Sequence, residues 1–306
     1  MLRSALGPRI CGWLDDPDIC EVMLNPDGRV WLDRLGSGLW ATDLVLRPAE
    51  GERVIRLAAH HAGREAHPGA PRVSAELPGG GERFEGLLPP VTAGPAFAIR
   101  KAAGQALRLA DYVAQGVMSG RAADALAAAV ASRANILVAG PTSSGKTTLA
   151  NALLAEPALA ADRVVILEDV RELRCPAPNS LALRVADPGV SMAALVRSAL
   201  RLRPDRIVVG EVRGGEALDL LKAWATGHPG GVGTVHAGSA AGALARLEHL
   251  VQEVAAAVPR GLIAEAVQVV AVLAGRGAER RLVELARVAG PAPDGWRLEP
   301  LAGGAG

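Results

Sequence analysis

The chain has 306 residues, of which 50% are hydrophobic and 21% charged, and its formal net charge is +1. This length can bury a sizeable core in two domains, and the near-zero charge gives no electrostatic reason to expect nucleic acid or anionic lipid as a partner. No apolar run reaches the roughly 18 to 20 residues that span a bilayer, and the short apolar stretch at the start is broken by Pro8 and Arg9. We therefore expect a cytoplasmic protein with no direct sequence-specific binding of nucleic acid.

Residues 1–103 are expected to form a small α+β domain without a chemical signature of its own. Glu21–Arg34 has the pattern of two strands joined by the turn Asn25-Pro26-Asp27-Gly28. Glu50–Ala62 has the apolar spacing of a helix. Further strands are expected at Arg83–Leu88 and Ala96–Arg100.

Residues 104–306 are expected to form a second domain, after a hinge at Ala102–Gln105. Helical segments alternate here with short apolar runs that have the length of buried strands. The helices are expected at Arg121–Arg133, Leu149–Leu154, Met192–Leu202, Gly215–Ala225 and Ala240–Val258. The strands are expected at Asn135–Gly140, Arg163–Asp169, Arg206–Gly210, Gly231–His236 and Val267–Ala274. This alternation predicts an α/β fold with a mainly parallel sheet covered on two sides.

The sequence GPTSSGKTT matches a phosphate-binding loop, the P-loop, between a predicted strand and a predicted helix. Its glycines let backbone N–H groups converge on phosphate oxygens, and the helix N-terminus adds positive partial charge. Lys146 is expected to reach the β and γ phosphates, Thr147 to hold Mg²⁺, and Thr148 to contact the α phosphate. The candidate ATP ligands are Gly140, Pro141, Thr142, Ser143, Ser144, Gly145, Lys146, Thr147 and Thr148.

Acidic residues follow two of the predicted strands. Glu168, Asp169 and Glu172 lie in LEDVREL, where carboxylates can orient Mg²⁺ or a water, although a solvated strand end is the alternative. Glu211 ends the strand in RIVVGEV and is the best candidate for the general base that activates the attacking water. The alternative for Glu211 is a simple strand terminator.

Two histidines lie in GHPGGVGTVHAGS. His236 ends a buried strand, and a histidine at a strand end is more often structural. Its position after two acid-tipped strands nevertheless favours a sensor of the γ phosphate. His228 precedes Pro229 in a turn, and no role is assigned to it.

These four stretches together resemble the motifs of the secretion ATPases, the P-loop motors of type II secretion, type IV secretion and type IV pili. GPTSSGKTT resembles their Walker A box, LEDVREL the acidic box, IVVGEVRGGEA the Walker B box, and TGHPGGVGTVHAGSA the histidine box. The match runs from about residue 120 to 275. EVMLNPDGRVWLDRLG, FAIRK and LARLEHLVQEV extend it over nearly the whole chain and are similar to the conjugal-transfer members of the type IV secretion branch.

The resemblance implies a RecA-like P-loop domain preceded by a smaller, PAS-like α+β domain. It also implies an ATPase that hydrolyses ATP to ADP and phosphate, with ATP and Mg²⁺ as its cofactors. The working form would be a homohexameric ring at the cytoplasmic face of the inner membrane. Its expected partners are the inner-membrane components of a type IV secretion or conjugation apparatus.

The family further implies arginines that reach the phosphates from the N-terminal domain or from a neighbouring subunit. Arg100 in FAIRK fits this role, with a surface salt bridge as the alternative. Arg133, just before the P-loop strand, is a second candidate for the nucleotide. Arg203 and Arg213 flank Glu211 and are expected to serve the same site.

The Walker B strand ends in Glu211 without a preceding aspartate, so direct binding of Mg²⁺ by Glu211 is not expected. Thr147 with Glu168 or Glu172 is the expected metal set. The candidate catalytic residues are Glu211, Lys146, His236, Glu168, Glu172 and Arg100.

Three alternatives stay open on the sequence alone. The first is a motor of a tight-adherence or type IV pilus system, and the second is a P-loop small-molecule kinase, for which no acceptor pocket is evident. The third is an assembly factor in which nucleotide only sets the shape of a ring. The three cysteines and His60, His61 and His67 lack ligand spacing, so they predict no metal centre.

Overall fold

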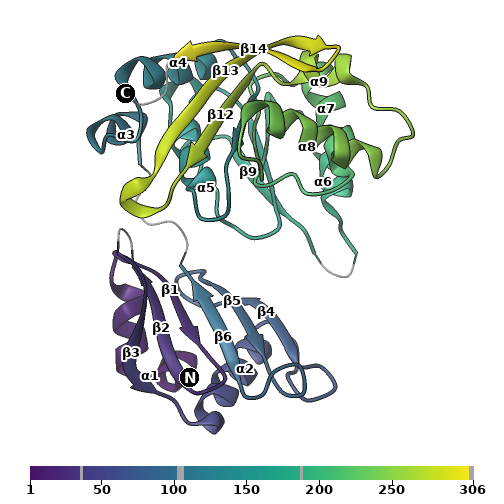
Figure 1. Cartoon of the computed structure of the whole chain (residues 1–306). Helices are drawn as coiled ribbons and strands as arrows, with labels where there is room; N and C mark the ends of the chain where they lie inside the picture. Colours follow the sequence, from purple (N-terminus) through teal and green to yellow (C-terminus); the bar gives the residue numbers. More distant parts are fainter. Residues whose placement is uncertain (35–36, 102–106, 187–188, 303–306) are drawn as a thin grey trace. The chain divides into compact units, whose positions relative to one another are not determined.

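The computed structural model describes residues 1–34, 37–101, 107–186 and 189–302. The chain forms two compact units, Met1–Gly104 and Gln105–Gly306, each with its own sheet (Figure 1). The predicted hinge at Ala102–Gln105 and the predicted boundary between residues 103 and 104 lie outside the described residues. None of the helices in the described ranges has both the length and the apolar composition that crossing a bilayer requires.

The first unit is an antiparallel sheet packed against helices α1 and α2. Its strands lie in the order β3-β2-β1-β6-β5-β4. The bounds are α1 Leu2–Asp15, β1 Ile19–Leu24, β2 Arg29–Arg34, β3 Gly38–Val45, α2 Pro48–His61, β4 Arg72–Glu76, β5 Arg83–Leu87 and β6 Ala96–Arg100. One core joins both helices to the sheet, with Ile10 of α1, Ile55 of α2 and Val22 of β1 fully buried in it.

Helix α1 is not predicted by the sequence pattern, because Pro8 interrupts its apolar residues. In the structure Gly7 takes a non-helical conformation, with φ 77° and ψ 167°. Pro8 therefore begins a new helical stretch, at a position where its missing N–H leaves no bond unmade. Ile10 and Leu14 then face the core.

The second unit is built on a larger sheet with the strand order β14-β13-β12-β7-β11-β10-β8-β9. Neighbouring strands from β12 to β9 are parallel, whereas β13 and β14 pair antiparallel at one edge. The strands are β7 Ile136–Ala139, β8 Val164–Glu168, β9 Ser180–Arg184, β10 Arg206–Val209, β11 Val232–Val235, β12 Val269–Ala274, β13 Arg281–Ala292 and β14 Gly295–Ala302. The predicted α/β fold with a mainly parallel sheet is confirmed.

Helices cover both faces of this sheet. They are α3 Leu109–Ala114, α4 Gly120–Ala131, α5 Lys146–Leu154, α6 Met192–Ala199, α7 Glu216–Ala225, α8 Ala240–Gln252 and α9 Arg260–Ala266. Leu137 and Ala139 of β7 belong to the core under α6 to α9, whereas Ile136 and Val138 belong to the core under α3 to α5. Because both faces of β7 are buried, the strand has the continuous apolar run from which it was predicted.

Some predicted boundaries are wrong. Helix α6 ends at Ala199 rather than Leu202, and α8 ends at Gln252 rather than Val258. The backbone continues as turns at residues 200–201 and 253–254. The sequence pattern predicts none of β3, β4, β9, β13 and β14, because partly exposed strands lack a continuous apolar run.

Candidate nucleotide site

The P-loop joins the carboxyl end of β7 to the first turn of α5. Gly140 passes close to the neighbouring strand, because a Cβ there would lie 2.7 Å from the carbonyl oxygen of Leu273. Gly145 has φ +91°, which side chains rarely permit, and it leads directly into Lys146. The first backbone N–H groups of a helix have no intrahelical acceptor, so this turn suits phosphate oxygens.

Side chains of the loop also fit a bound anion. The Lys146 ammonium lies 3.0 Å from the carbonyl oxygen of Gly140 and 2.9 Å from that of Pro141. The Ser144 hydroxyl is buried and has no hydrogen-bond partner among the described residues. A cation and a buried hydroxyl at the same turn are suited to phosphate oxygens.

A series of polar contacts runs from the P-loop along the carboxyl edge of the sheet. Lys146 Nζ lies 3.4 Å from His236 Nδ1, and His236 Nε2 lies 3.0 Å from Glu211 Oε1. Arg213 then contacts Glu211 Oε2 at 2.7 Å and Asp169 Oδ2 at 3.2 Å. The residues follow β7, β11, β10 and β8, which are neighbours in that order. The sheet therefore brings together the Walker A, histidine, Walker B and acidic stretches.

The charges in this series set the protonation states. Burial raises the pKa of Glu211, but the hydrogen bond and charge of Arg213, with the charges of His236 and Lys146, outweigh it and lower the pKa overall. Burial and the charge of Lys146 lower the pKa of His236, against the opposing effect of Glu211. A neutral His236 with its proton on Nε2 donates to Glu211 and accepts from Lys146 at Nδ1. Glu211 is therefore an ionised acceptor beside the P-loop.

The residues predicted to hold Mg²⁺ have two different environments. Thr147 Oγ1 donates to Glu172 Oε2 over 3.2 Å, so these two oxygens lie together at the start of α5. Glu168 Oε1 instead accepts the backbone N–H groups of Glu172 and Leu173, at 2.9 and 2.7 Å. Burial raises the pKa of Glu168. Glu168 thus positions the segment that carries Glu172.

This donor set fits Mg²⁺. The ion is usually held by one or two protein oxygens together with substrate phosphates and water, rather than by a cage of carboxylates. The described ranges of the chain contain no cluster of three or more histidine, cysteine, aspartate or glutamate side chains suited to a metal. Thr147 and Glu172 match a site in which one or two protein oxygens hold Mg²⁺ together with phosphates and water.

Other predicted residues lie at the opposite edge of the second sheet. Arg133 is paired with Asp162, and Arg206 Nε donates to the same carboxylate over 2.6 Å. These residues lie at the amino ends of β7, β8 and β10, away from the P-loop, so Arg133 is not a phosphate ligand within its own chain. Arg203 likewise precedes β10, and His228 Nδ1 lies 3.0 Å from the carbonyl oxygen of Pro204. Of the two arginines that flank Glu211 in sequence, only Arg213 contacts it.

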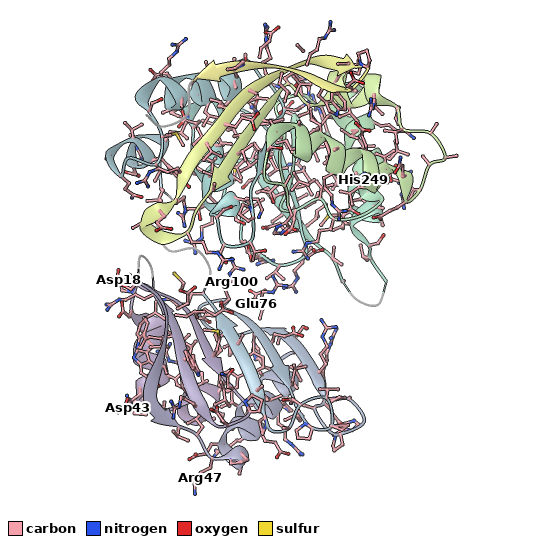
Figure 2. The ribbon with its side chains drawn as sticks, viewed as in Figure 1. Asp18, Asp43, Arg47, Glu76, Arg100 and His249 are labelled. Carbon is pink, nitrogen blue, oxygen red and sulfur yellow. The ribbon has the colours of Figure 1, made fainter. Side chains whose placement is uncertain are left out.

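Arg100 belongs to the first unit, whereas the P-loop belongs to the second. It is exposed at the end of β6 and is labelled in Figure 2. In the sheet its Cα pairs with those of Glu21 and Arg83. Arg100 is therefore a surface cation of the first unit.

One arginine beside the P-loop is missing from the predicted site. Arg280, between β12 and β13, lies against Gly145: a Cβ on Gly145 would be 2.8 Å from Arg280 Cζ. No motif marks it, since the turn also contains Arg276 and Arg281 and the contact joins distant parts of the sequence. Only its position in the fold identifies it.

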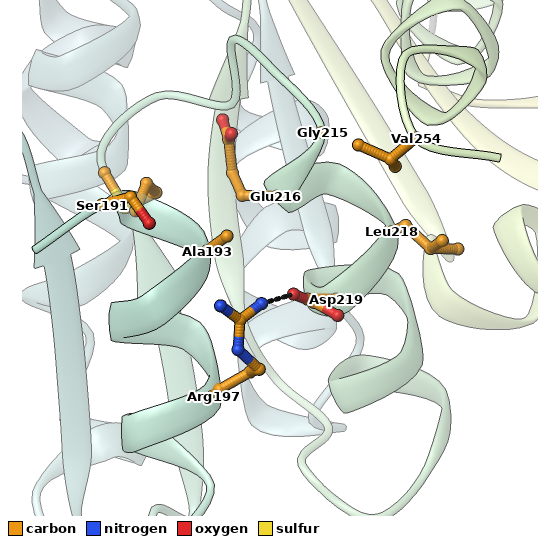
Figure 3. Close-up of a pocket in the computed structure, with 9 residues that line it drawn as sticks. Ser191, Ala193, Arg197, Gly215, Glu216, Leu218, Asp219 and Val254 are labelled. Atoms are coloured by element: carbon orange, nitrogen blue, oxygen red, sulfur yellow. Dashed lines mark hydrogen bonds and ion pairs between the residues drawn. The ribbon is translucent and has the colours of Figure 1, made fainter.

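A separate pocket of about 410 Å³ lies between the starts of α6 and α7, beside Val254 (Figure 3). Its lining includes Ser191 and the ion pair between Arg197 and Asp219. The pocket contains none of the predicted nucleotide-binding or catalytic residues. The candidate site is therefore the P-loop turn and the strand ends beside it.

Comparisons with known proteins agree with the nucleotide site that the geometry indicates. The family described as type II/IV secretion system protein matches residues 55–282. The chain is 48% identical over 303 residues to the conjugal transfer protein TrbB of Rhizobium radiobacter, covering 98% of this chain and 93% of the relative. It is 36% identical over 317 residues to the type IV secretion system protein PtlH of Bordetella pertussis, covering 89% and 91%.

A solved structure has the same fold at low sequence identity. The crystal structure of the pilus retraction motor PilT with bound ADP aligns with a TM-score of 0.64 and 18% identity. The alignment covers 95% of this chain and 80% of that one.

Proposed function

The chain belongs to the family of type II/IV secretion system proteins, and from this premise we propose that it is a motor ATPase of a conjugative type IV secretion apparatus. The reaction is the hydrolysis of ATP to ADP and phosphate. One observation supports it above the others: the contacts from Lys146 through His236 to Glu211 place an ionised carboxylate beside the P-loop. Hydrolysis needs a base for water, and Glu211 supplies it.

The P-loop and the residues at the strand ends have different roles in the proposed reaction. The backbone of the loop and Lys146 bind the phosphates, while Thr147 and Glu172 hold Mg²⁺. When bound, Mg²⁺ neutralises negative charge on the phosphates. Glu211 accepts the proton of the attacking water, and His236 orients Glu211 through their 3.0 Å contact.

Arg213 controls when Glu211 can act. Its guanidinium occupies one oxygen of Glu211, and the pKa of Glu211 is lowered partly by this partner. A base with a depressed pKa holds a proton weakly. Movement of Arg213 from Glu211 towards the γ phosphate raises the basicity of Glu211 and adds positive charge to the developing phosphoryl group.

The wider function follows from the family. The proposed working form is a homohexamer, peripheral at the cytoplasmic face of the inner membrane and bound to the inner-membrane components of the apparatus. Arg100 completes the site by supplying a cation to the phosphates from the first unit, in its own chain or a neighbouring subunit. In the relatives, conjugal transfer and type IV secretion are the named processes, and we assign the same class of process to this chain.

The test is Glu211→Gln, which keeps the size of the side chain and removes its basicity. Phosphate release should fall by about 10² to 10⁴-fold, the usual contribution of a positioned base, whereas ADP binding should be retained. Glu253→Gln, at the exposed end of α8, is the matched control and should hydrolyse ATP at the wild-type rate. An unchanged rate in Glu211→Gln would exclude Glu211 as the base.

A further inference from the structure

Arg280 is held beside the P-loop by a tight turn. The turn follows β12 at Gly275, where φ is +72° and a Cβ would lie 3.2 Å from the backbone nitrogen of Arg280. Glu279 N donates to Arg276 O over 3.0 Å, which closes the short helical turn before Arg280. Leu282 N then donates to Val117 O over 2.8 Å as β13 begins. The backbone on both sides of Arg280 is thus fixed by the fold.

The guanidinium of Arg280 lies directly on the loop backbone. A Cβ built on Gly145 would lie 2.8 Å from both Cζ and Nε of Arg280 and 3.1 Å from Nη1. Only glycine leaves room for this approach. Gly145 therefore has two reasons to be glycine, its positive φ and the cation against it.

No protein group balances this cation in the described part of the chain. Arg280 Nε is buried and has no hydrogen-bond partner there, and no carboxylate is paired with the guanidinium. The nearby Tyr112 cannot serve, because burial raises the pKa of its phenol more than the charge of Arg280 lowers it, and the phenol stays neutral. A buried guanidinium donor without an acceptor is unfavourable, so an acceptor from outside the chain is favoured here.

The position of Arg280 in the sheet indicates which part of a nucleotide it meets. Strand β7 carries the P-loop, with β11 on one side and β12 on the other. His236 and Glu211 approach the loop from the side of β11, where the γ phosphate belongs. Arg280 approaches from the side of β12 and contacts Gly145 rather than the hydrolytic groups. A triphosphate bound at the P-loop would therefore contact different protein groups at its two ends, with Arg280 at the end away from the γ phosphate.

We propose that Arg280 binds the α phosphate of ATP and of ADP, donating from its guanidinium to a phosphate oxygen at the side of the loop opposite Glu211. The proposal rests on the nucleotide site assigned above, but not on hydrolysis. Because ATP and ADP share the α phosphate, Arg280 contributes equally to the binding of substrate and product. It sets affinity and leaves the rate of the bound complex unchanged.

The experiment measures ADP and ATP dissociation constants together with kcat and KM for the full chain. Arg280→Ala removes the donors, and Arg280→Met also removes them but keeps a long unbranched side chain, in case the smaller side chain disturbs folding. Arg276→Ala, an exposed arginine of the same turn, is the matched control. ADP and ATP should each bind about tenfold more weakly in both Arg280 variants, with kcat within about twofold of wild type. Arg280→Lys should recover part of the affinity.

The outcomes separate this inference from the proposed function. Unchanged ADP affinity in both Arg280→Ala and Arg280→Met overturns the role of Arg280. A loss that differs strongly between ATP and CTP overturns the phosphate assignment, because it indicates stacking on the base. If the wild-type chain binds ADP but never hydrolyses ATP, the proposed hydrolysis fails while the ADP measurements still decide the role of Arg280.

Discussion

At the scale of single residues, the site depends on how Glu211 shares its two oxygens. One oxygen is paired with Arg213 and the other with His236, so the carboxylate is ionised and oriented. His236 links Glu211 to Lys146 only as a neutral ring, because its Nδ1 must accept a hydrogen bond. The protonation state of His236 thus couples the base to the phosphate-binding lysine.

This coupling predicts the pH dependence of hydrolysis. The pKa of His236 is lowered below its ordinary value of about 6.5, so the ring is neutral at pH 7 and gains a proton only below that value. Protonation at Nδ1 places a second cation against Lys146 and removes the acceptor. Phosphate release should be flat from pH 8 to about 6.5 and decline at lower pH.

The measurement is a pH–rate profile of the wild type and of His236→Gln. The variant should be slower and should lose the acid limb, since glutamine does not titrate. His249→Gln, an exposed histidine of α8, is the control and should keep the wild-type profile (Figure 2). If His236→Gln keeps the acid limb unchanged, the assignment of that limb to His236 is contradicted. Glu211 is not expected to produce the limb, because the pKa of Glu211 lies below its ordinary value.

At the scale of elements, the two edges of the sheet in the second unit have different roles, one in the candidate site and the other in stability. Its carboxyl edge carries the P-loop and the side chains beside it. Its amino edge carries a buried ion pair in which Asp162 and Arg206 are 5% and 2% exposed. Arg206 also donates to the carbonyl oxygen of Val130 over 3.0 Å, so the pair joins β8 and β10 to the end of α4. The amino edge fixes the strands whose other ends form the site.

Breaking this ion pair should destabilise the second unit. Asp162→Ala leaves the Arg206 guanidinium buried without its carboxylate, and we expect a loss of about 3 to 5 kcal/mol in the free energy of unfolding. Arg133→Ala should cost about 1 kcal/mol or less, because Arg133 is 43% exposed and water replaces its bond to Asp162. Urea unfolding followed by tryptophan fluorescence gives both values. Similar losses for the two variants would contradict this account.

At the scale of the whole molecule, the candidate residues are divided between two units. The P-loop, Glu211 and His236 belong to the second unit, and Arg100 belongs to the first. Each unit has its own hydrophobic core, so the phosphate site and Arg100 rest on separately stabilised frameworks.

Arg100→Ala tests whether a residue of the first unit takes part in the reaction. If Arg100 reaches the phosphates, its removal should lower kcat by about 10³-fold or more, as for other arginines that stabilise phosphoryl transfer. The mass of the assembly with ATP and Mg²⁺, measured by light scattering, should equal that of the wild type. Arg72→Ala, on the exposed edge strand of the same sheet, is the control and should be fully active. Wild-type activity in Arg100→Ala would remove Arg100 from the site.

Mixing two inactive variants locates the partner of Arg100. When Arg100→Ala and Glu211→Gln chains are combined, a site that uses Glu211 of one subunit and Arg100 of its neighbour regains activity. A site built within one chain does not, because every subunit then keeps one defect. A strict monomer that never hydrolyses ATP, with or without Mg²⁺, would contradict the motor itself.

Local patterns made much of the site predictable. The contiguous P-loop sequence encodes its own turn through Gly140 and Gly145, and the strands before the acids are short apolar runs. Parallel strands end at one edge, so Glu211, His236 and Asp169 could be expected together before their contacts were known. Partly exposed strands such as β13 and the kinked α1 gave no comparable pattern, because their form depends on what packs against them.

The sequence by itself determined the family, the P-loop and the parallel arrangement of the second sheet, since motif spacing and apolar runs are written along the chain. Only the tertiary structure decided which arginines lie at the phosphate loop. Arg133 is close to the loop in sequence but lies at the far end of β7, whereas Arg280 is distant in sequence and touches Gly145. The reason is physical: a strand carries its two ends to opposite edges of a sheet, and the turn after a neighbouring strand returns to the same edge.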